Sequence, residues 1–430
     1  MSAFKHATIP INPFRISHST DEIDSLKTLL RLSPLGPDTF ENGANRPSNM
    51  GIDMRSMRKI RDDWLAYDWS KTQDELNALP QFMAQVQDKD PKTGKEREFN
   101  IHFIGYESGK AGAIPVLLLH GWPGMGCFEL APMVEHLQKN AKQPLDIIIP
   151  SLPGYMYSSP PPIDGEFDFD AVARVMHNFM LGLGYKFGYA TQGGDLGALV
   201  SRYIACRYDE CKTTVRPRTF SFFYTLISSL KVNFLFLKLD APALRDVPLT
   251  DTDKAHVARY KKFGQTGMGY AMEHGTRPST IGFAVASSPL ALASWIGEKI
   301  IDSWSSEVPT SILMQWLTLF WLTQSFPTSI YMYRRIATLG DFTRSPTSDE
   351  AQDFTKPLSG LKVDKKIGYS TFPKEIFPVP KVWAEKTGDL VFYRLNKEGG
   401  HFAGLENPEL LAKDFAEFLE IAWLKSTSKL

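Results

Sequence analysis

A sharp turn centred on one aspartate is the stretch of this sequence best suited to chemistry. Gly193-Gly194-Asp195-Leu196-Gly197 follows an apolar, strand-like run from Phe187 to Ala190 and precedes residues that favour a helix. Glycines on both sides of a central residue suit a strained strand-to-helix turn, which exposes the side chain of that residue. A carboxylate at a helix N-terminus stays ionised, because unpaired N–H groups and the helix dipole stabilise its charge. Asp195 is therefore either an ordinary helix N-cap or a nucleophile.

A histidine near the end of the chain could complete a nucleophilic site. An aspartate that attacks carbon forms an alkyl ester, and hydrolysis of that ester needs a base to activate water and N–H donors for the oxyanion. His401 follows Gly399 and Gly400 and precedes the last predicted helix, in the chain order nucleophile, acid, histidine. His120 is the other histidine at a predicted strand end, and we expect it to hold its loop by hydrogen bonds. A lone histidine is usually structural, but the glycine pair and the chain order favour His401 as the base.

Three carboxylates could orient that histidine. Glu385 and Asp389 flank a short polar turn and have the pattern of solvated charges. Glu375 lies between apolar residues after a strand-like run from Ile367 to Phe372, so we prefer it as the orienting acid.

Hydrogen-bond donors determine which electrophile the aspartate would attack. The backbone N–H groups of Trp122 and Leu196 are the expected oxyanion donors. An epoxide opens to an alkoxide, a poor leaving group unless proton donors meet it. Tyr270 and Tyr333 could supply them, although buried aromatic residues mostly belong to cores. A halide would instead need N–H donors such as tryptophan indoles, and the position after the nucleophile holds Leu196.

The segments that must position these residues have the pattern of an α/β fold. Continuous apolar strands alternating with helices predict a mostly parallel sheet covered on both faces, with its chemistry at the carboxyl ends of the strands. The predicted strands are Phe99–Ile104 after a hairpin tip at Asp88–Lys95, Ile114–Leu119, Leu145–Pro150, the run into Asp195, Val232–Leu237, Ile367–Phe372, Lys381–Ala384 and Leu390–Tyr393. The predicted helices are Asp21–Leu32, two within Arg55–Leu79, Asp168–Leu183, Ile312–Gln324 and Pro408–Leu424.

Changes in these patterns divide the chain into five segments. We expect a leader that meanders over residues 1–112, a first part of the core over 113–239, a helical lid over 240–340, a second part of the core over 341–424 and an exposed tail over 425–430. Thr219–Lys238 is the most apolar stretch, but Lys231 and Asn233 interrupt it, so we expect no membrane span there.

Composition excludes several classes of protein. Lys+Arg and Asp+Glu number 48 each, so there is no electrostatic footprint for nucleic acid or an anionic membrane. Three cysteines without a CxxC motif argue against a disulfide framework and indicate a reducing compartment. The chain ends in Ser428-Lys429-Leu430, the peroxisomal address tripeptide, so we expect a peroxisomal import receptor as a partner and favour the peroxisome over the cytoplasm.

Taken together, the motifs resemble those of the microsomal-type epoxide hydrolases of the α/β-hydrolase superfamily, in their soluble fungal branch. The motifs that carry the resemblance are the Trp64 and Trp69 region, His120-Gly121-Trp122-Pro123-Gly124, Ser151-Leu152-Pro153-Gly154-Tyr155, Gln192-Gly193-Gly194-Asp195, Tyr270-Ala271-Met272-Glu273-His274, Trp295-Ile296-Gly297-Glu298-Lys299, Phe372-Pro373-Lys374-Glu375 and Gly399-Gly400-His401-Phe402-Ala403. The resemblance implies an α/β-hydrolase fold with a lid between strands, a leader that braces the lid, and dimers in some relatives.

The same resemblance implies a role for each site residue. It makes Asp195 the nucleophile, His401 and Glu375 the charge pair, and Tyr270 and Tyr333 the donors to the epoxide oxygen. No cofactor and no metal ion are expected. We therefore expect an enzyme that converts an epoxide and water into a vicinal diol, in lipid metabolism, secondary metabolism or detoxification. The alternatives are a dehalogenase with the same nucleophile, a ring-opening cyclase or isomerase, and a catalytically inactive scaffold.

The chain departs from the family pattern at three places. We expect no N-terminal anchor like that of the membrane-bound members, and Leu196 stands where many members of that family carry a tryptophan after the nucleophile. Thr213 to Lys231 interrupts the passage from the helix after Asp195 into the next strand. We interpret that segment as either a lineage-specific loop or a translated, unspliced intron.

Overall fold

A mostly parallel sheet of nine strands forms the centre of the computed structural model, which describes residues 4–47, 50–217, 248–305, 308–336 and 362–424. The strand order is β1-β2-β3-β5-β4-β6-β7-β8-β9. The first three pairings in that order are antiparallel and the other five are parallel. The strands are β1 Ile11–Pro13, β2 Gln81–Lys89, β3 Glu96–Tyr106, β4 Ile114–Leu119, β5 Leu145–Pro150, β6 Tyr189–Gly193, β7 Cys211–Pro217, β8 Val363–Thr371 and β9 Gly388–Leu395.

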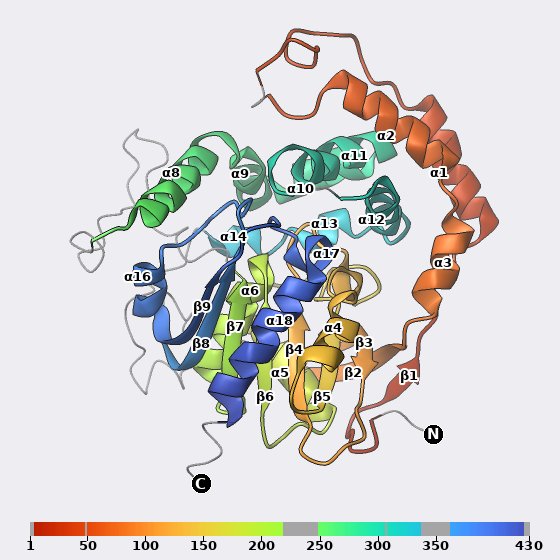
Figure 1. Cartoon of the computed structure of the whole chain (residues 1–430). Helices are drawn as coiled ribbons and strands as arrows, with labels where there is room; N and C mark the ends of the chain where they lie inside the picture. Colours follow the sequence, from red (N-terminus) through yellow and green to blue (C-terminus); the bar gives the residue numbers. More distant parts are fainter. Residues whose placement is uncertain (1–3, 48–49, 218–247, 306–307, 337–361, 425–430) are drawn as a thin grey trace.

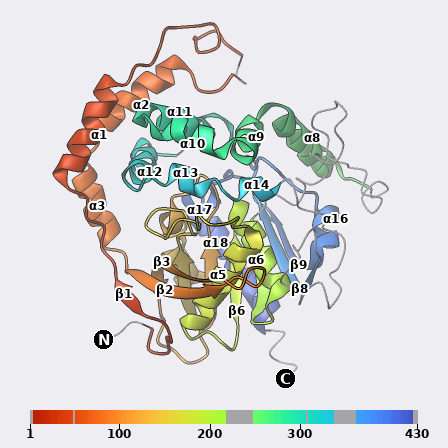
Figure 2. The ribbon, with the colours of Figure 1, turned by 180° about the vertical axis from the view of Figure 1, so that it is seen from behind.

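Helices cover both faces of this sheet, as continuous apolar strands require. Figures 1 and 2 show α4 (Met133–Asn140) and α18 (Pro408–Leu419) on one face, and α5 (Phe169–Gly182) and α6 (Asp195–Arg207) on the other. Strands β4 and β5 have the predicted bounds and are buried along almost their whole length. The prediction of an α/β-hydrolase fold with a mostly parallel central sheet is confirmed.

A layer of helices lies between β7 and β8 in the sequence and above the sheet in Figure 1, within the segment predicted to form a lid. These lid elements are α8 Asp251–Thr266, α9 Gly269–Thr276, α10 Pro278–Ala286, α11 Pro289–Glu298, η2 Lys299–Ser303, α12 Thr310–Leu322, α13 Phe326–Ser329 and α14 Tyr333–Ile336. Shorter elements of the core are η1 Gly126–Glu129, α16 Lys381–Ala384, η3 Glu385–Thr387, α17 Ala403–Glu406 and η4 Glu420–Leu424.

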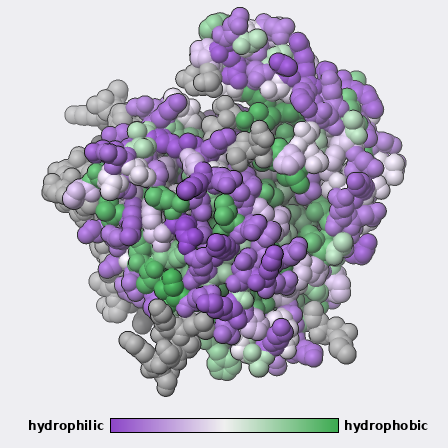
Figure 3. All heavy atoms as spheres, viewed as in Figure 1, coloured by the Kyte–Doolittle hydropathy of each residue, from purple (hydrophilic) through white to green (hydrophobic). Residues whose placement is uncertain are grey.

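The leader forms three helices that run along one side of the molecule and reach the lid (Figure 1). They are α1 Thr20–Leu32, α2 Met54–Ala66 and α3 Trp69–Asn77, close to the predicted bounds. The buried Trp64 indole N–H donates to the Thr318 hydroxyl of α12 at 2.8 Å, and Ser288 donates to Ser33 at 3.0 Å. The surface of the leader is mostly hydrophilic in Figure 3, and Leu26, Leu30 and Trp64 are buried, whereas Leu32 and Phe40 are exposed.

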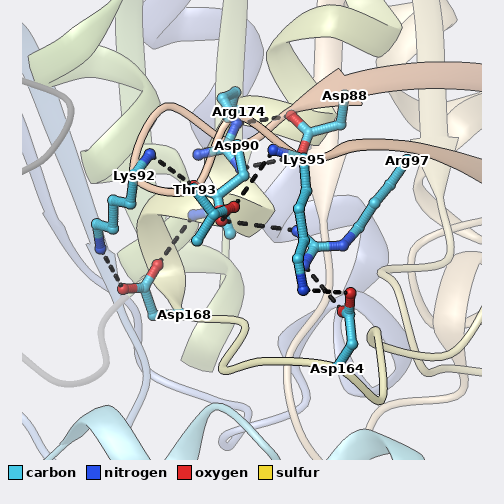
Figure 4. A network of polar contacts seen from close by, with 10 residues as sticks. Asp88, Asp90, Lys92, Thr93, Lys95, Arg97, Asp164, Asp168 and Arg174 are labelled. Atoms are coloured by element: carbon cyan, nitrogen blue, oxygen red, sulfur yellow. Dashed lines mark hydrogen bonds and ion pairs between the residues drawn. The ribbon is translucent and has the colours of Figure 1, made fainter.

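Ion pairs fix the tip of the predicted hairpin between β2 and β3 to the segment before α5 (Figure 4). Lys95 and Arg97 contact Asp164 at 2.8 and 2.9 Å, and Lys92 contacts Asp168 at 3.2 Å. The same segment before α5 also contacts the lid, because Glu166 forms ion pairs with Arg334 and Arg335 of α14.

One sequence prediction about the second half of the sheet is wrong. Lys381–Ala384 is the short helix α16 and not a strand, because Pro380 precedes it at the N-cap and four residues are too few to show a period. Thr213–Pro217, the start of the segment interpreted as an insert, belongs to β7, which pairs with both β6 and β8. The remainder of the supposed insert and the predicted strand Val232–Leu237 lie outside the described residues.

No single helix of the described residues is long and apolar enough to cross a membrane. The helices Pro278–Ala286 and Pro289–Ile301 meet the length and hydropathy criteria only when they are taken together, and the chain bends by 117° between them.

Candidate active site

The turn at Asp195 has the strained geometry expected of a nucleophile elbow. Strand β6 ends at Gly193, and α6 begins at Asp195, whose backbone φ is +50°. A non-glycine residue rarely adopts this conformation, and such strain concentrates at functional sites. A β-carbon on Gly193 would lie 2.2 Å from the carbonyl oxygen of Gly197, and one on Gly197 would lie 2.4 Å from that of Leu119. Glycine is therefore required on both sides of the elbow.

Both carboxylate oxygens of Asp195 have a defined neighbour. The backbone N–H of Trp122 donates to Oδ1 at 2.7 Å, and Nε2 of His401 lies 3.4 Å from Oδ2. The loop that holds Trp122 packs so closely that a β-carbon on Gly121 would lie 2.2 Å from Cβ of Asp195. The structure thus places the first expected oxyanion donor on Asp195. Leu196 is buried directly after it, and its N–H stays a predicted second donor.

His401 lies between Asp195 and Glu375, and all three side chains are buried. Nδ1 of His401 is 3.0 Å from Oε1 of Glu375, which also accepts the backbone N–H of Phe377 at 3.2 Å. Burial disfavours a charged ring, but the charges of Glu375 and Asp195 outweigh it and raise the pKa of His401 to about 10.

The competing acids Glu385 and Asp389 lie away from this pair. Glu385 is in η3, and Asp389 is an exposed residue of β9. Glu375 is thus the candidate acid that the structure brings to His401, which is the arrangement the sequence favours.

The glycine pair before His401 brings the loop against the lid. Gly399 has a φ of +99°, and the backbone N–H of His401 donates to the carbonyl oxygen of Trp304 in the lid at 2.7 Å. A β-carbon on Gly400 would lie 2.6 Å from that same oxygen. Lid and histidine loop are therefore joined by a hydrogen bond that only glycine at position 400 leaves room for.

The two tyrosines of the lid meet on the ring of Trp122. Tyr270 of α9 stacks on it at 5.3 Å and 11°, and Tyr333 of α14 meets it edge-on at 5.8 Å and 87°. Both rings are buried, and their hydroxyls lie beside each other, with no other hydrogen-bond partner in the described part of the chain. Burial first, and the charge of Asp195 as a further cause, hold the pKa of both hydroxyls well above the ordinary tyrosine value. Each hydroxyl is therefore protonated, and a bound epoxide oxygen would offer an acceptor to both of them.

His120 holds its loop as expected. Its Nδ1 donates to the Gly121 carbonyl oxygen at 2.9 Å, and its Nε2 accepts the Leu152 N–H at 2.9 Å. Burial lowers the pKa of His120 to about 4, so the ring is neutral.

Sequence reasoning missed one carboxyl group beside the site. Glu129 is buried under the Trp122 loop, and a β-carbon on Gly124 would lie 2.0 Å from its Oε2. Burial and the charge of Asp195 raise the pKa of Glu129 to about 8, so the group is neutral at pH 7. The sequence feature that could have pointed to Glu129 is its position as a single acidic residue inside the apolar run Met125–Leu130.

Sequence reasoning also left His274 without a role, although it lies in a recognised motif. Its Nε2 accepts the Trp295 indole N–H at 3.0 Å, and its ring packs edge-on against Trp122 and Tyr333 at 4.6 and 4.8 Å. Burial and the nearby Lys299 lower its pKa to about 3. His274 thus serves as a neutral member of the aromatic cluster that holds Tyr333.

Among the described residues, no group of three or more His, Cys, Asp or Glu side chains is placed to hold a metal ion.

Comparison with known proteins relates this chain to one enzyme family. A family model described as the epoxide hydrolase N terminus matches residues 11–127, and one for the alpha/beta hydrolase fold matches residues 114–216. The structure of Aspergillus niger epoxide hydrolase superposes with a TM-score of 0.82, at 35% identity over 98% of this chain and 100% of that one.

More distant relatives extend the match to animals. Epoxide hydrolase 1 of Sus scrofa is 28% identical over 427 residues, covering 95% of this chain and 88% of its own length. The juvenile hormone epoxide hydrolase of Bombyx mori has the same fold, with a TM-score of 0.76 at 24% identity over 96% of this chain and 95% of that one.

Proposed function

The chain belongs to the epoxide hydrolase family, and we propose that it converts an epoxide and water into a vicinal diol through a covalent ester on Asp195. The observation that carries this proposal is that the two carboxylate oxygens of Asp195 have different neighbours. Oδ1 accepts the Trp122 N–H, which leaves Oδ2 as the attacking atom, on the side of His401. A serine at this elbow would favour acyl transfer, whereas a carboxylate attacks an alkyl carbon.

The first step would open the ring. Oδ2 of Asp195 attacks one epoxide carbon, and the electron pair of the breaking C–O bond moves to the oxygen. Tyr270 and Tyr333 meet that oxygen with their hydroxyls and give it a proton. The burial and the protonated state of both hydroxyls support this role.

The second step would hydrolyse the ester. His401, oriented by Glu375, takes a proton from water, and the resulting hydroxide attacks Cγ of Asp195. The oxyanion forms on Oδ1, where the Trp122 N–H stabilises it. The tetrahedral intermediate releases the diol oxygen, which takes the proton from His401. Asp195 is regenerated as an acid, and its proton passes through solvent to the tyrosines.

Trapping the ester tests this function. The His401→Gln variant should bind an epoxide and stop at the alkyl-enzyme, which intact mass would show as one added substrate mass. The Asp195→Ala variant is the blank. Release of halide from haloalkanes would favour a dehalogenase, and consumption of epoxide without diol would favour a cyclase or isomerase.

We also propose that the enzyme acts in peroxisomes, because of the tail Ser428-Lys429-Leu430, which lies outside the described residues. Fatty-acid-derived epoxides and intermediates of a compartmentalised biosynthetic pathway both suit that location. A fluorescent protein fused to the N-terminus should be punctate with the full chain and diffuse without the last three residues.

A homodimer is a further proposal, based on the family resemblance alone. Sedimentation of the full chain would decide it, because a species of about twice the chain mass is expected.

A further inference from the structure

A buried lysine of the lid lies against one of the two proposed proton donors. Lys299 is 3% exposed and begins η2, a π-helical turn directly after α11. Its ammonium is 5.1 Å from the centroid of the Tyr270 ring and 5.5 Å from that of Trp295. Lysines are almost never fully buried unless paired, and π-helical turns recur at functional sites.

This lysine forms an ion pair with its neighbour in the chain. Nζ of Lys299 lies 3.0 Å from Oε1 of Glu298, whose side chain is 34% exposed. Burying an ammonium group costs desolvation free energy, and an apolar side chain of similar length would fill this space at lower cost. A lysine at this place therefore suggests a use for its charge, and the ring beneath the charge is that of Tyr270.

We propose that Lys299 is a positioning residue that stabilises the negative charge that builds up on Tyr270 while the epoxide opens. This inference rests on the proposed function. As the Tyr270 O–H proton moves to the epoxide oxygen, the electron pair of the O–H bond stays on the phenol and spreads into its ring. A cation over the ring face attracts that added charge more strongly than it attracts the neutral ring. The interaction is therefore stronger in the transition state than in the ground state, which is the condition for acceleration.

The side chains around Lys299 allow an electrostatic role to be distinguished from simple packing. Lys299 also lies over Trp295, whose indole holds His274, so a purely structural lysine would support the whole aromatic cluster, including Tyr333. An electrostatic lysine would act on Tyr270 and leave the contribution of Tyr333 unchanged.

Pre-steady-state kinetics with two lysine variants test the charge. With styrene oxide in excess, Lys299→Met should form the alkyl-enzyme about tenfold more slowly than the wild type and hydrolyse it at the wild-type rate. Lys299→Arg, which keeps a cation suited to an aromatic face, should retain most of the alkylation rate. Equal rates for Lys299→Met and the wild type would overturn the proposal, as would an arginine variant as slow as the methionine variant.

A pair of tyrosine backgrounds tests the target. In the Tyr270→Phe background, adding Lys299→Met should slow alkylation no further, because the charge it stabilises is no longer formed. In the matched Tyr333→Phe background the tenfold loss should persist. The same loss in both backgrounds would assign Lys299 to packing and overturn the proposal. If the wild type itself formed no alkyl-enzyme, the proposed function would fail instead, so the two failures are distinguishable.

Discussion

Replacing Asp195 with asparagine should release the proton that His401 holds. The charge on Asp195 lies 3.4 Å from Nε2 of His401 and is one cause of its raised pKa of about 10. At an effective dielectric constant of about 20, two unit charges at that 3.4 Å separation attract by roughly 5 kcal/mol. This energy corresponds to a change of between about three and four powers of ten in the protonation equilibrium of His401. Glu375 is the larger cause of the rise and remains in the variant, so loss of the Asp195 charge should lower the pKa of His401 markedly from about 10.

The same release should occur in catalysis. A ring with a pKa of about 10 is protonated at neutral pH and cannot act as a base. Alkylation turns the Asp195 carboxylate into a neutral ester, so His401 would become a base only once there is an ester to hydrolyse. Asp195→Asn imitates that neutral state without substrate.

Histidine-selective NMR measures the effect. The chain has nine histidines, so the His401 signal is assigned by its loss in His401→Gln. The titration midpoint should fall markedly from the wild type to Asp195→Asn, with intact mass confirming that the amide persists. An unchanged midpoint in Asp195→Asn would refute the idea that the nucleophile controls the base.

Three further predictions follow from groups around the site. Glu129→Gln should raise the free energy of unfolding above pH 8 and change it little below pH 4.5. The reason is that a buried acid with a folded pKa of about 8 loses its stabilising effect as pH rises through that value. Urea unfolding at several pH values would measure the change, and no gain in the free energy of unfolding at pH 9 would contradict the prediction. Gly400→Ala should reduce turnover at least tenfold with a smaller change in melting temperature, because its β-carbon would lie 2.6 Å from the Trp304 carbonyl oxygen and displace His401; an unaffected kcat would contradict the lid contact. The stabilising effect of His401, present below its unfolded pKa near 6.5, should be lost as pH rises through about 10, so the stability difference between wild type and His401→Gln should shrink across that interval, and a constant difference would count against the raised pKa.

The sequence predicts the elbow and its partners because their chemistry depends on glycine. Gly193, Gly197 and Gly400 lie where a β-carbon would collide with backbone, so the requirement for glycine is visible as a pattern in the sequence. The bounds of strands β4 and β5 are also predictable, because an apolar run enclosed by turn residues has few other interpretations.

The errors arise where the local pattern is too weak. The four residues Lys381–Ala384 contain Val and Trp, which favour a strand, but the preceding proline favours the helix that forms. Cys211–Pro217 has the β-branched Thr213, Thr214 and Val215 of a strand, and only the order of the sheet shows that it fills the place between β6 and β8.

Burial and ring geometry cannot be seen in the sequence. The neutral state of Glu129 depends on enclosure by the Trp122 loop, and the position of Lys299 over Tyr270 depends on the π-helical turn of the lid. Neither residue type suggests its environment, so both environments become apparent only in three dimensions.

Isotope labelling tests the central claim most directly. One turnover of wild-type enzyme in excess over its epoxide, in water labelled with ¹⁸O, should place the label in the Asp195 carboxylate and leave the first diol unlabelled, because solvent oxygen enters at Cγ and the oxygen given to the diol comes from Oδ2. Mass spectrometry of the peptide containing Asp195 reads the result. Label in the diol with none in Asp195 would show direct attack by water and contradict the covalent mechanism.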